Sequence, residues 1–303
     1  MTQDIRQRIA EKKAVLAKLR PLPRAALERL RQELSVEWTY NSNAIEGNTV
    51  SLRETRLVIE QGLTISGKTL REHFEINNHQ RAIAFVESIA KRRTAITEAE
   101  LLEIHRLVHD NIETEFAGRY RTGRVRILGA NFVPPNHLKV RDLVRDLLSE
   151  TAGSEADIVT LAARFHHRLV WIHPFYDGNG RTARLLMNLL LMRNGLPPAI
   201  ILVNDRKKYY RALDAANNGN LKPFELLVAQ AIERSLDIYL DAAGHNGPDD
   251  YVPLSQLAEK FPYSQEYLSL LARRGLIDAY KRSRNWVATE RSVLDYIARQ
   301  TNR

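Results

Sequence analysis

The chain has 303 residues, of which 44% are hydrophobic and 27% are charged, a composition typical of a soluble globular protein with two or three domains. No apolar run reaches the roughly 18 residues that a membrane-spanning helix needs, and the absence of cysteine excludes disulfides, thiolate metal sites and a cysteine nucleophile. The formal net charge of +9 fits nucleotide phosphates, an acidic protein surface or DNA equally well, and it also fits a merely solvated basic surface.

The first hundred residues are expected to be helical. Polar and apolar residues mix at helical spacing over 1–18, 23–45 and 70–91. Thr97, followed three residues later by Glu100, forms a capping box that predicts the start of another helix. The N-terminus carries charge throughout and lacks the apolar stretch of a secretory signal, so we expect the protein to act in the cytoplasm without inserting into a membrane.

The pattern changes over 117–140, where glycine, β-branched residues and paired prolines predict a β-hairpin. Helical patterns resume over 140–148 and 156–172. The stretch after Gly180, which ends at Gly195 and Pro197, is apolar on nearly all sides and is typical of the central helix of a bundle. We therefore expect a mainly α protein, a helical bundle with one hairpin.

The segment between the last two predicted helices, His173-Pro174-Phe175-Tyr176-Asp177-Gly178-Asn179-Gly180-Arg181-Thr182-Ala183-Arg184, gathers groups suited to phosphate chemistry. Pro174 disfavours helical geometry at His173 and so places a titratable side chain on a loop. The Gly-Asn-Gly turn leads into a helix N-terminus and can turn successive backbone N–H groups towards an anion. Two arginines three residues apart on the first turn can reach one phosphate chain, and Asp177 offers the hard oxygen that Mg²⁺ prefers.

This segment, HPFYDGNGRTAR, resembles the motif of the Fic family, H-x-F-x-[DE]-G-N-G-R-x-x-R, and agrees with it at every fixed position. The chain contains no kinase-like HRD or DFG and no GxGxxG after a strand, so those commoner nucleotide sites are not indicated. The resemblance extends over about 35–240. It implies a protein that transfers AMP from ATP to a hydroxyl group of another protein, with Mg²⁺ or Mn²⁺ as metal and ATP as co-substrate.

By the same resemblance, His173 is the general base that takes the proton from a Ser, Thr or Tyr hydroxyl as it attacks the α-phosphate. Asp177 is then the metal ligand and Arg184 contacts the γ-phosphate. The remaining phosphate-binding residues implied are Gly178, Asn179, Gly180 and Arg181. UMP, phosphate or phosphocholine transfer is known on the same fold, and the motif does not exclude them.

Two further segments resemble parts of Fic proteins that surround the nucleotide. The hairpin expected over 117–140 resembles the flap that aligns an extended target segment by strand addition, with Ile127, Leu128 and Gly129 as its contact edge. NDRKKYYRALDAANNGN resembles the stretch that closes the adenine pocket, with Tyr209 and Asn217 at the matching positions. The alternative for this second segment is an ordinary amphipathic helix with a polar C-terminus.

A third segment predicts regulation. Ser42-Asn43-Ala44-Ile45-Glu46-Gly47 resembles the inhibitory pattern [ST]-x-x-x-E-[GN] of Fic proteins that inhibit themselves. Gly47 indicates a helix stop, which puts Glu46 at the negative end of a helix dipole, where a carboxylate is unfavourable. Pairing with Arg184 would explain this placement and would withdraw the arginine from ATP. In some family members this glutamate also helps water to remove AMP from a modified target.

The last part of the chain predicts a separate small domain. Two short helical patterns around Phe261-Pro262-Tyr263-Ser264 are typical of a helix-turn-helix or winged-helix-like module, in which 264–274 would enter the major groove of DNA. From Asp249 onward nine basic residues face seven acidic ones, a weak balance for DNA binding, so protein docking or dimerisation is the other interpretation. We expect three domains: a helical region with the inhibitory helix at 1–95, a Fic core at 96–243 and this module at 244–303.

Two functions therefore follow from the sequence. The first is an autoinhibited protein adenylyltransferase that binds ATP. Its second substrate is a hydroxyl side chain of a target protein or of the chain itself. The second is a DNA-binding regulator or toxin-antitoxin component that uses its Fic domain as a nucleotide sensor. The intact motif favours the first function, whereas a homodimer and the partner of the C-terminal module stay open.

Overall fold

The structure is a computed structural model that describes residues 2–20, 22, 24–92, 94–127, 132–244, 251–282 and 285–301. The chain divides into two compact units, one formed by Arg31–Glu225 and the other by Met1–Leu30 together with Leu226–Arg303. The domain boundaries predicted from the sequence stay a prediction. Among the described residues, no helix is long and apolar enough to cross a membrane.

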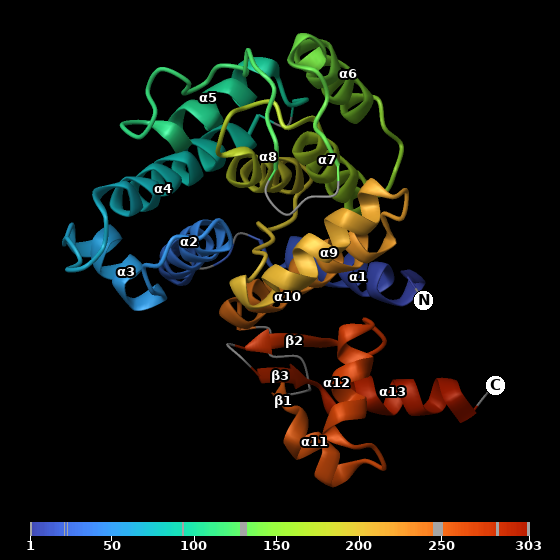
Figure 1. The fold of residues 1–303 in the computed structure, drawn as a ribbon. Helices are drawn as coiled ribbons and strands as arrows, with labels where there is room; N and C mark the ends of the chain where they lie inside the picture. Colours follow the sequence, from blue (N-terminus) through green and yellow to red (C-terminus); the bar gives the residue numbers. More distant parts are fainter. Residues whose placement is uncertain are drawn as a thin grey trace. The chain divides into compact units, whose positions relative to one another are not determined.

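All regular elements of the larger unit's described residues are helices (Figure 1). Its elements are most of α2 (Arg24–Ile45), α3 (Leu52–Gln61), α4 (Leu70–Ala90), α5 (Glu98–His109), η1 (His137–Lys139), α6 (Val140–Ala152), α7 (Ile158–Ile172), α8 (Asn179–Arg193), η2 (Val203–Asp205) and α9 (Arg206–Asn217). The predicted helices 23–45, 70–91, 140–148 and 156–172 are confirmed. Helix α3 was not predicted, although its capping box of Ser51 and Glu54 is visible in the sequence.

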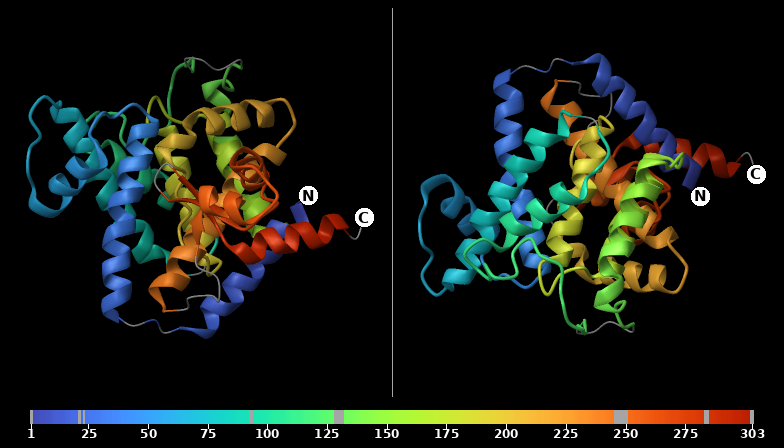
Figure 2. Two further views of the ribbon diagram at one scale, coloured as in Figure 1. Left: turned by 90° about the horizontal axis from the view of Figure 1, so that it is seen from below. Right: turned by 90° about the horizontal axis from the view of Figure 1, so that it is seen from above.

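Helix α8 forms the centre of this unit. It packs against α4, α5 and α7, and its residues are buried from Leu185 to Leu191, as a helix apolar on all sides must be. Figure 1 shows α8 enclosed by these neighbours, and Figure 2 shows α2 as one long helix that leads into α3 and α4. The N-terminus of α8, where the sequence motif lies, is therefore held by elements from several parts of the chain.

The hairpin expected over 117–140 is not found as such. Residues 117–127 and 132–136 contain no strand, and η1 already begins at His137, so the expectation of two regular paired strands is wrong for the described residues. The buried side chain of Arg121 holds this segment by bonding to carbonyls of Gly123 and Pro135. Leu128 and Gly129, two of the predicted contact residues, lie outside the described residues.

The second unit contains α1 (Thr2–Lys18), most of α10 (Lys222–Ala242) and a C-terminal module. The module consists of β1 (Val252–Pro253), α11 (Leu254–Lys260), α12 (Gln265–Arg273), β2 (Ala279–Arg282), β3 (Asn285–Ala288) and α13 (Glu290–Thr301). Its strands form an antiparallel sheet in the order β1-β3-β2, in which Val252 and Ala279 both pair with Ala288. In this module two short helices are followed by a strand pair and a third helix, and the helix-turn-helix or winged-helix-like character expected from the sequence stays a prediction.

The larger unit buries several neutral histidines, which makes its stability depend on pH. Burial lowers the pKa of His105 to about 3 and that of His109 to about 4, and it takes His79 and His166 well below the ordinary value. The unfolded chain therefore binds more protons than the folded one between about pH 4 and 6.5, and the free energy of unfolding falls as the pH is lowered through that window.

We predict a loss of about 2 kcal/mol for each fully buried histidine between pH 7 and pH 5, measured as the free energy of unfolding in denaturant titrations. The variant His109→Gln removes one titrating group whose Nε2 is buried without a partner among the described residues. The unfolding free energy of this variant should therefore depend less steeply on pH, because up to one proton fewer is taken up on unfolding. An unchanged slope would contradict this explanation.

Candidate functional site

The loop between α7 and α8 takes the backbone path that the sequence indicated. His173 ends α7 in the left-handed conformation with φ 51° and ψ 60°, which is uncommon for a residue with a side chain. Gly178 precedes α8 with φ 73°, and a Cβ atom there would lie 2.4 Å from Nε2 of His109. This glycine is therefore required both by its backbone angle and by the close approach of α5.

The loop is fixed to the core by Phe175 and Asn179. The ring of Phe175 is fully buried and stacks on His105 with 3.6 Å between ring centroids. The side chain of Asn179 forms two hydrogen bonds with the backbone of Phe175. Nδ2 of Asn179 donates to the Phe175 carbonyl (2.9 Å), and Oδ1 of Asn179 accepts from the Phe175 N–H (3.0 Å). His105 accepts the Gly118 N–H on Nδ1, which leaves Nε2 to donate to the Asp177 carbonyl (3.0 Å).

The imidazole of His173 is neutral and has a defined tautomer. Its Nδ1 lies 3.3 Å from the carbonyl oxygen of Val170, and a carbonyl only accepts, so the proton of the neutral ring belongs on Nδ1. Burial is the main cause that lowers the pKa of His173, to about 4, and the cation of Arg121 acts in the same direction. At neutral pH the ring therefore has a free lone pair on Nε2.

The first turn of α8 offers an anion site that a carboxylate of this chain already fills. Among the described residues, no side chain caps this N-terminus, so its backbone N–H groups and the positive end of the helix dipole face outwards. A Cβ atom on Gly180 would lie only 2.2 Å from Oε1 of Glu46. The carboxylate of Glu46 thus lies directly over the turn that the sequence identified as a phosphate cradle.

Glu46 and Ser42 bind the buried guanidinium of Arg184. The Nη2 atom of Arg184 donates to Oε1 of Glu46 and to the carbonyl of Ser42, each at 2.8 Å, and Nε donates to the Ser42 hydroxyl at 3.0 Å. Helix α2 ends at Ile45, and Gly47 has φ 106°, as the predicted helix stop requires. The predicted pairing of Glu46 with Arg184 is present.

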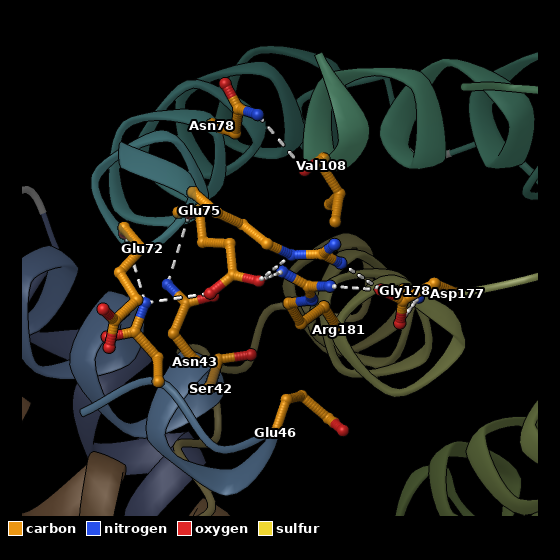
Figure 3. A network of polar contacts seen from close by, with 12 residues as sticks. Ser42, Asn43, Glu46, Glu72, Glu75, Asn78, Val108, Asp177, Gly178 and Arg181 are labelled. Atoms are coloured by element: carbon orange, nitrogen blue, oxygen red, sulfur yellow. Dashed lines mark hydrogen bonds and ion pairs between the residues drawn. The ribbon is translucent and has the colours of Figure 1, made fainter. Parts of the chain in front are cut away.

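A second group of charges surrounds Arg181 and Asp177 (Figure 3). Arg181 is buried, and its Nη1 lies 3.2 Å from Oε1 of Glu75 on α4. The Asp177 carboxylate accepts from the Gly178 N–H (2.6 Å) and from Arg71 (2.8 Å). Burial raises the pKa of Asp177, but Arg181 and the Gly178 N–H outweigh that effect and hold the pKa below its ordinary value.

Asp177 is the one carboxylate of the motif, and it is the group whose chemistry suits Mg²⁺. Its carboxylate is ionised and half-exposed, and carboxylate oxygen is a preferred ligand of Mg²⁺. Within the described ranges, no group of three or more His, Cys, Asp or Glu side chains could hold a metal ion alone. A single carboxylate that shares the ion with phosphate oxygens and water fits the usual pattern for Mg²⁺.

The two residues predicted for the adenine pocket, Tyr209 and Asn217, contact different side chains. Tyr209 is fully buried, and its hydroxyl lies 3.4 Å from Nη1 of Arg184 and 3.2 Å from Nε2 of His166. Asn217, the last residue of α9, binds Nε2 of His167 at 2.9 Å. Ile127 is half-buried in the segment before the undescribed residues.

Four residues of this site were not identified from the sequence: Arg71 and Glu75 on α4, His105 on α5, and Arg121. Arg71 and Glu75 stand four residues apart on one helix, a spacing that in the sequence indicates only a surface ion pair. Nothing in the local sequence shows that they meet a loop more than a hundred residues away. The histidine and the arginine lack a local signal in the same way.

Comparison with known proteins identifies similar chains. The sequence profile described as the Fic/DOC family matches residues 95–191. Protein adenylyltransferase fic-1 of Caenorhabditis elegans is 41% identical over 221 residues, which cover 72% of this chain and 43% of that protein. Protein adenylyltransferase Fic of Nematostella vectensis is 38% identical over 244 residues, which cover 79% of this chain and 56% of that protein.

A solved structure of Fic-1 (residues 134–508) from C. elegans has a TM-score of 0.71 and 35% identity, and the match covers 80% of this chain and 74% of that one. The chain spans about half the length of the curated relatives it matches.

We predict that Glu46→Gln strengthens the binding of Mg·ATP by about tenfold, because the amide no longer neutralises Arg184 and leaves the guanidinium to the nucleotide. Isothermal titration calorimetry of the variant and the unmodified protein measures this difference. Glu33→Gln, which removes an exposed carboxylate of the same helix, is the matched control and should bind ATP as the unmodified protein does. Equal affinity of Glu46→Gln and the unmodified protein would contradict the prediction.

Proposed function

Because the chain belongs to the Fic/DOC family, we propose that it is a protein adenylyltransferase that inhibits itself through Glu46. The proposed reaction transfers AMP from ATP to a Ser, Thr or Tyr hydroxyl of a target protein or of the chain itself. The observation that carries this proposal is the position of the Glu46 carboxylate, which lies over Gly180 and binds Arg184 inside the phosphate-binding motif.

The proposed role of His173 follows from its tautomer. Its free Nε2 takes the proton of the target hydroxyl as that oxygen attacks the α-phosphorus of ATP. The new P–O bond forms while the bond to the β-phosphate oxygen breaks, and pyrophosphate leaves. A pKa of about 4 keeps His173 unprotonated at neutral pH. The same low pKa makes the imidazole a weak base, so most of the catalysis must come from positioning and charge.

The proposed roles of the other motif residues concern the phosphates. The N–H groups of Gly178, Asn179 and Gly180 cradle the anion at the start of α8. Arg181 neutralises charge on the α- and β-phosphates, and Asp177 holds Mg²⁺ or Mn²⁺, which supplies further positive charge there when bound. Arg184 reaches the γ-phosphate once Glu46 has left it.

In the inhibited state, the charged groups of the site are paired with opposite charges of the chain. Arg184 is bound by Glu46, Arg181 lies against Glu75, and Asp177 is bound by Arg71. The triphosphate and its metal must replace these partners before ATP can bind productively. The position of Glu46 beside the cradle also supports the reverse activity, in which the carboxylate orients a water molecule that removes AMP from a modified target.

The comparisons do not favour the alternative of a DNA-binding regulator. The partner of the C-terminal module stays a proposal, and the near balance of charge in this module supports a protein or a second copy of the chain rather than DNA. The cytoplasmic location stays a prediction.

We predict that label from α-³²P-ATP enters protein when Glu46→Gly is incubated with a cell lysate, at least about a hundredfold more than with the unmodified protein, because Arg184 is then free for ATP. The double variant Glu46→Gly with His173→Ala should lose this labelling, and γ-³²P-ATP should give no label with either variant beyond what the kinases of the lysate alone incorporate. γ-label above that of the lysate alone would indicate phosphate transfer instead. If no α-label enters any variant, the proposed function is wrong.

A further inference from the structure

A buried arginine outside the sequence motif binds the backbone of the proposed catalytic loop. Arg121 is 2% exposed, and its Nε donates to the carbonyl oxygen of His173 at 2.7 Å. Its Nη1 donates to the carbonyl of Gly123 at 2.9 Å, and its Nη2 donates to the carbonyl of Pro135 at 2.5 Å and lies 3.5 Å from that of Ile172. The backbone N–H of Arg121 donates to the carbonyl of Pro174 at 2.9 Å.

This environment is unusual for an arginine. Every acceptor is a main-chain carbonyl, and within the described part of the chain no carboxylate forms an ion pair with it. Burial accordingly lowers the pKa of Arg121, although a guanidinium stays protonated in proteins. A buried cation is unfavourable unless its hydrogen bonds compensate for the lost water, so such a residue weakly favours folding at best. A role in placing the groups that it binds explains its presence better.

The groups that it binds need such support. His173 is a non-glycine residue in the left-handed region, a conformation that costs about 1 kcal/mol or more and persists only where surrounding contacts determine it. The carbonyls of Ile172 and His173 lie at the end of α7, where helix carbonyls lack internal partners and where a cation is favourable. Arg121 supplies both the donors and the charge at this point.

The same guanidinium joins a second part of the chain to this loop. Gly123 and Pro135 belong to the segment predicted to cover the site, and Pro135 stands 14 residues after Arg121 in the chain. The planar fork has donors that point in several fixed directions, so one side chain can reach carbonyls of separate segments. An ammonium group, which is a single point of charge, cannot span them.

We propose that Arg121 is a positioning residue: it holds His173 in its left-handed backbone conformation and fixes the loop relative to Gly123 and Pro135. Arg121 acts through His173 and contacts none of the predicted phosphate-binding groups in the described structure. The effect of Arg121 on catalysis rests on the proposed function, in which His173 is the base. A displacement of the base by about 1 Å lowers the rate of a reaction by up to about a hundredfold, whereas nucleotide binding is left largely intact.

The test uses the released protein, Glu46→Gly, with Arg121→Lys or Arg121→Gln added. Lysine keeps the charge and loses the fork, and glutamine loses both. The transfer kcat should fall by at least about tenfold in both variants, more for glutamine than for lysine, while KM for ATP changes by less than about twofold. A kcat equal to that of the parent in both folded variants, or a rise in KM with unchanged kcat, would overturn the proposal.

Arg193→Lys is the matched control, because Arg193 is another buried arginine of the same unit, and it forms a forked pair with Glu100. It should lower the melting temperature and leave kcat unchanged. A fall in kcat equal to that of Arg121→Lys would show a general effect of lost packing and would overturn the specific role of Arg121.

A second measurement separates this inference from the proposed function. In protein labelled with ¹³C and ¹⁵N at histidine, the backbone chemical shifts of His173 report whether it keeps its left-handed conformation. The shifts should move in Arg121→Gln and stay in place in Arg193→Lys. If Glu46→Gly transfers no AMP, the proposed function fails, and unchanged His173 shifts in folded Arg121→Gln would then be the result that overturns the positioning role.

Discussion

The guanidinium of Arg184 is buried in the centre of the larger unit, and a buried cation must find partners there. The chain supplies them from α2, where Ser42 gives a hydroxyl and a carbonyl and Glu46 gives the charge. The same arginine lies on the first turns of α8, a helix whose start has no side-chain cap among the described residues. Removing Glu46 therefore leaves a positive site without its counter-charge, and this makes an external polyanion a suitable replacement.

The second constraint is the backbone of the loop before α8. His173 and Gly178 both lie in the left-handed region, and the contacts around them come from α5, from Asn179 and from Arg121. A neutral imidazole in a fixed tautomer is of use only if its Nε2 stays in one place. The buried polar contacts of this loop are thus better understood as positioning His173, the proposed base, than as stabilising the fold, because buried charges contribute little to net stability.

The sequence predicted the parts of this site that depend on local chemistry. The order His-Pro, Gly-Asn-Gly and two arginines three apart determines a helix end, a tight turn and a helix start, and the structure has each of them. It could not predict contacts such as Arg181 with Glu75 or Arg121 with Pro135, because these depend on how distant helices pack and have no local pattern. The expected hairpin failed for a related reason: glycine and β-branched residues favour strands, but the buried side chain of Arg121 binds the carbonyls of Gly123 and Pro135, and no local pattern predicts these contacts.

The most direct test of the central claim, that Glu46 withholds Arg184 from the γ-phosphate, is the ³¹P NMR spectrum of Mg·ATP bound to the unmodified protein and to Glu46→Gly at saturating protein. A guanidinium bound to a terminal phosphate changes the resonance of that phosphorus. The account predicts a shifted γ resonance in Glu46→Gly and a γ resonance close to that of free Mg·ATP in the unmodified protein. The same γ shift in both proteins would contradict it, because Arg184 would then reach the phosphate with Glu46 in place.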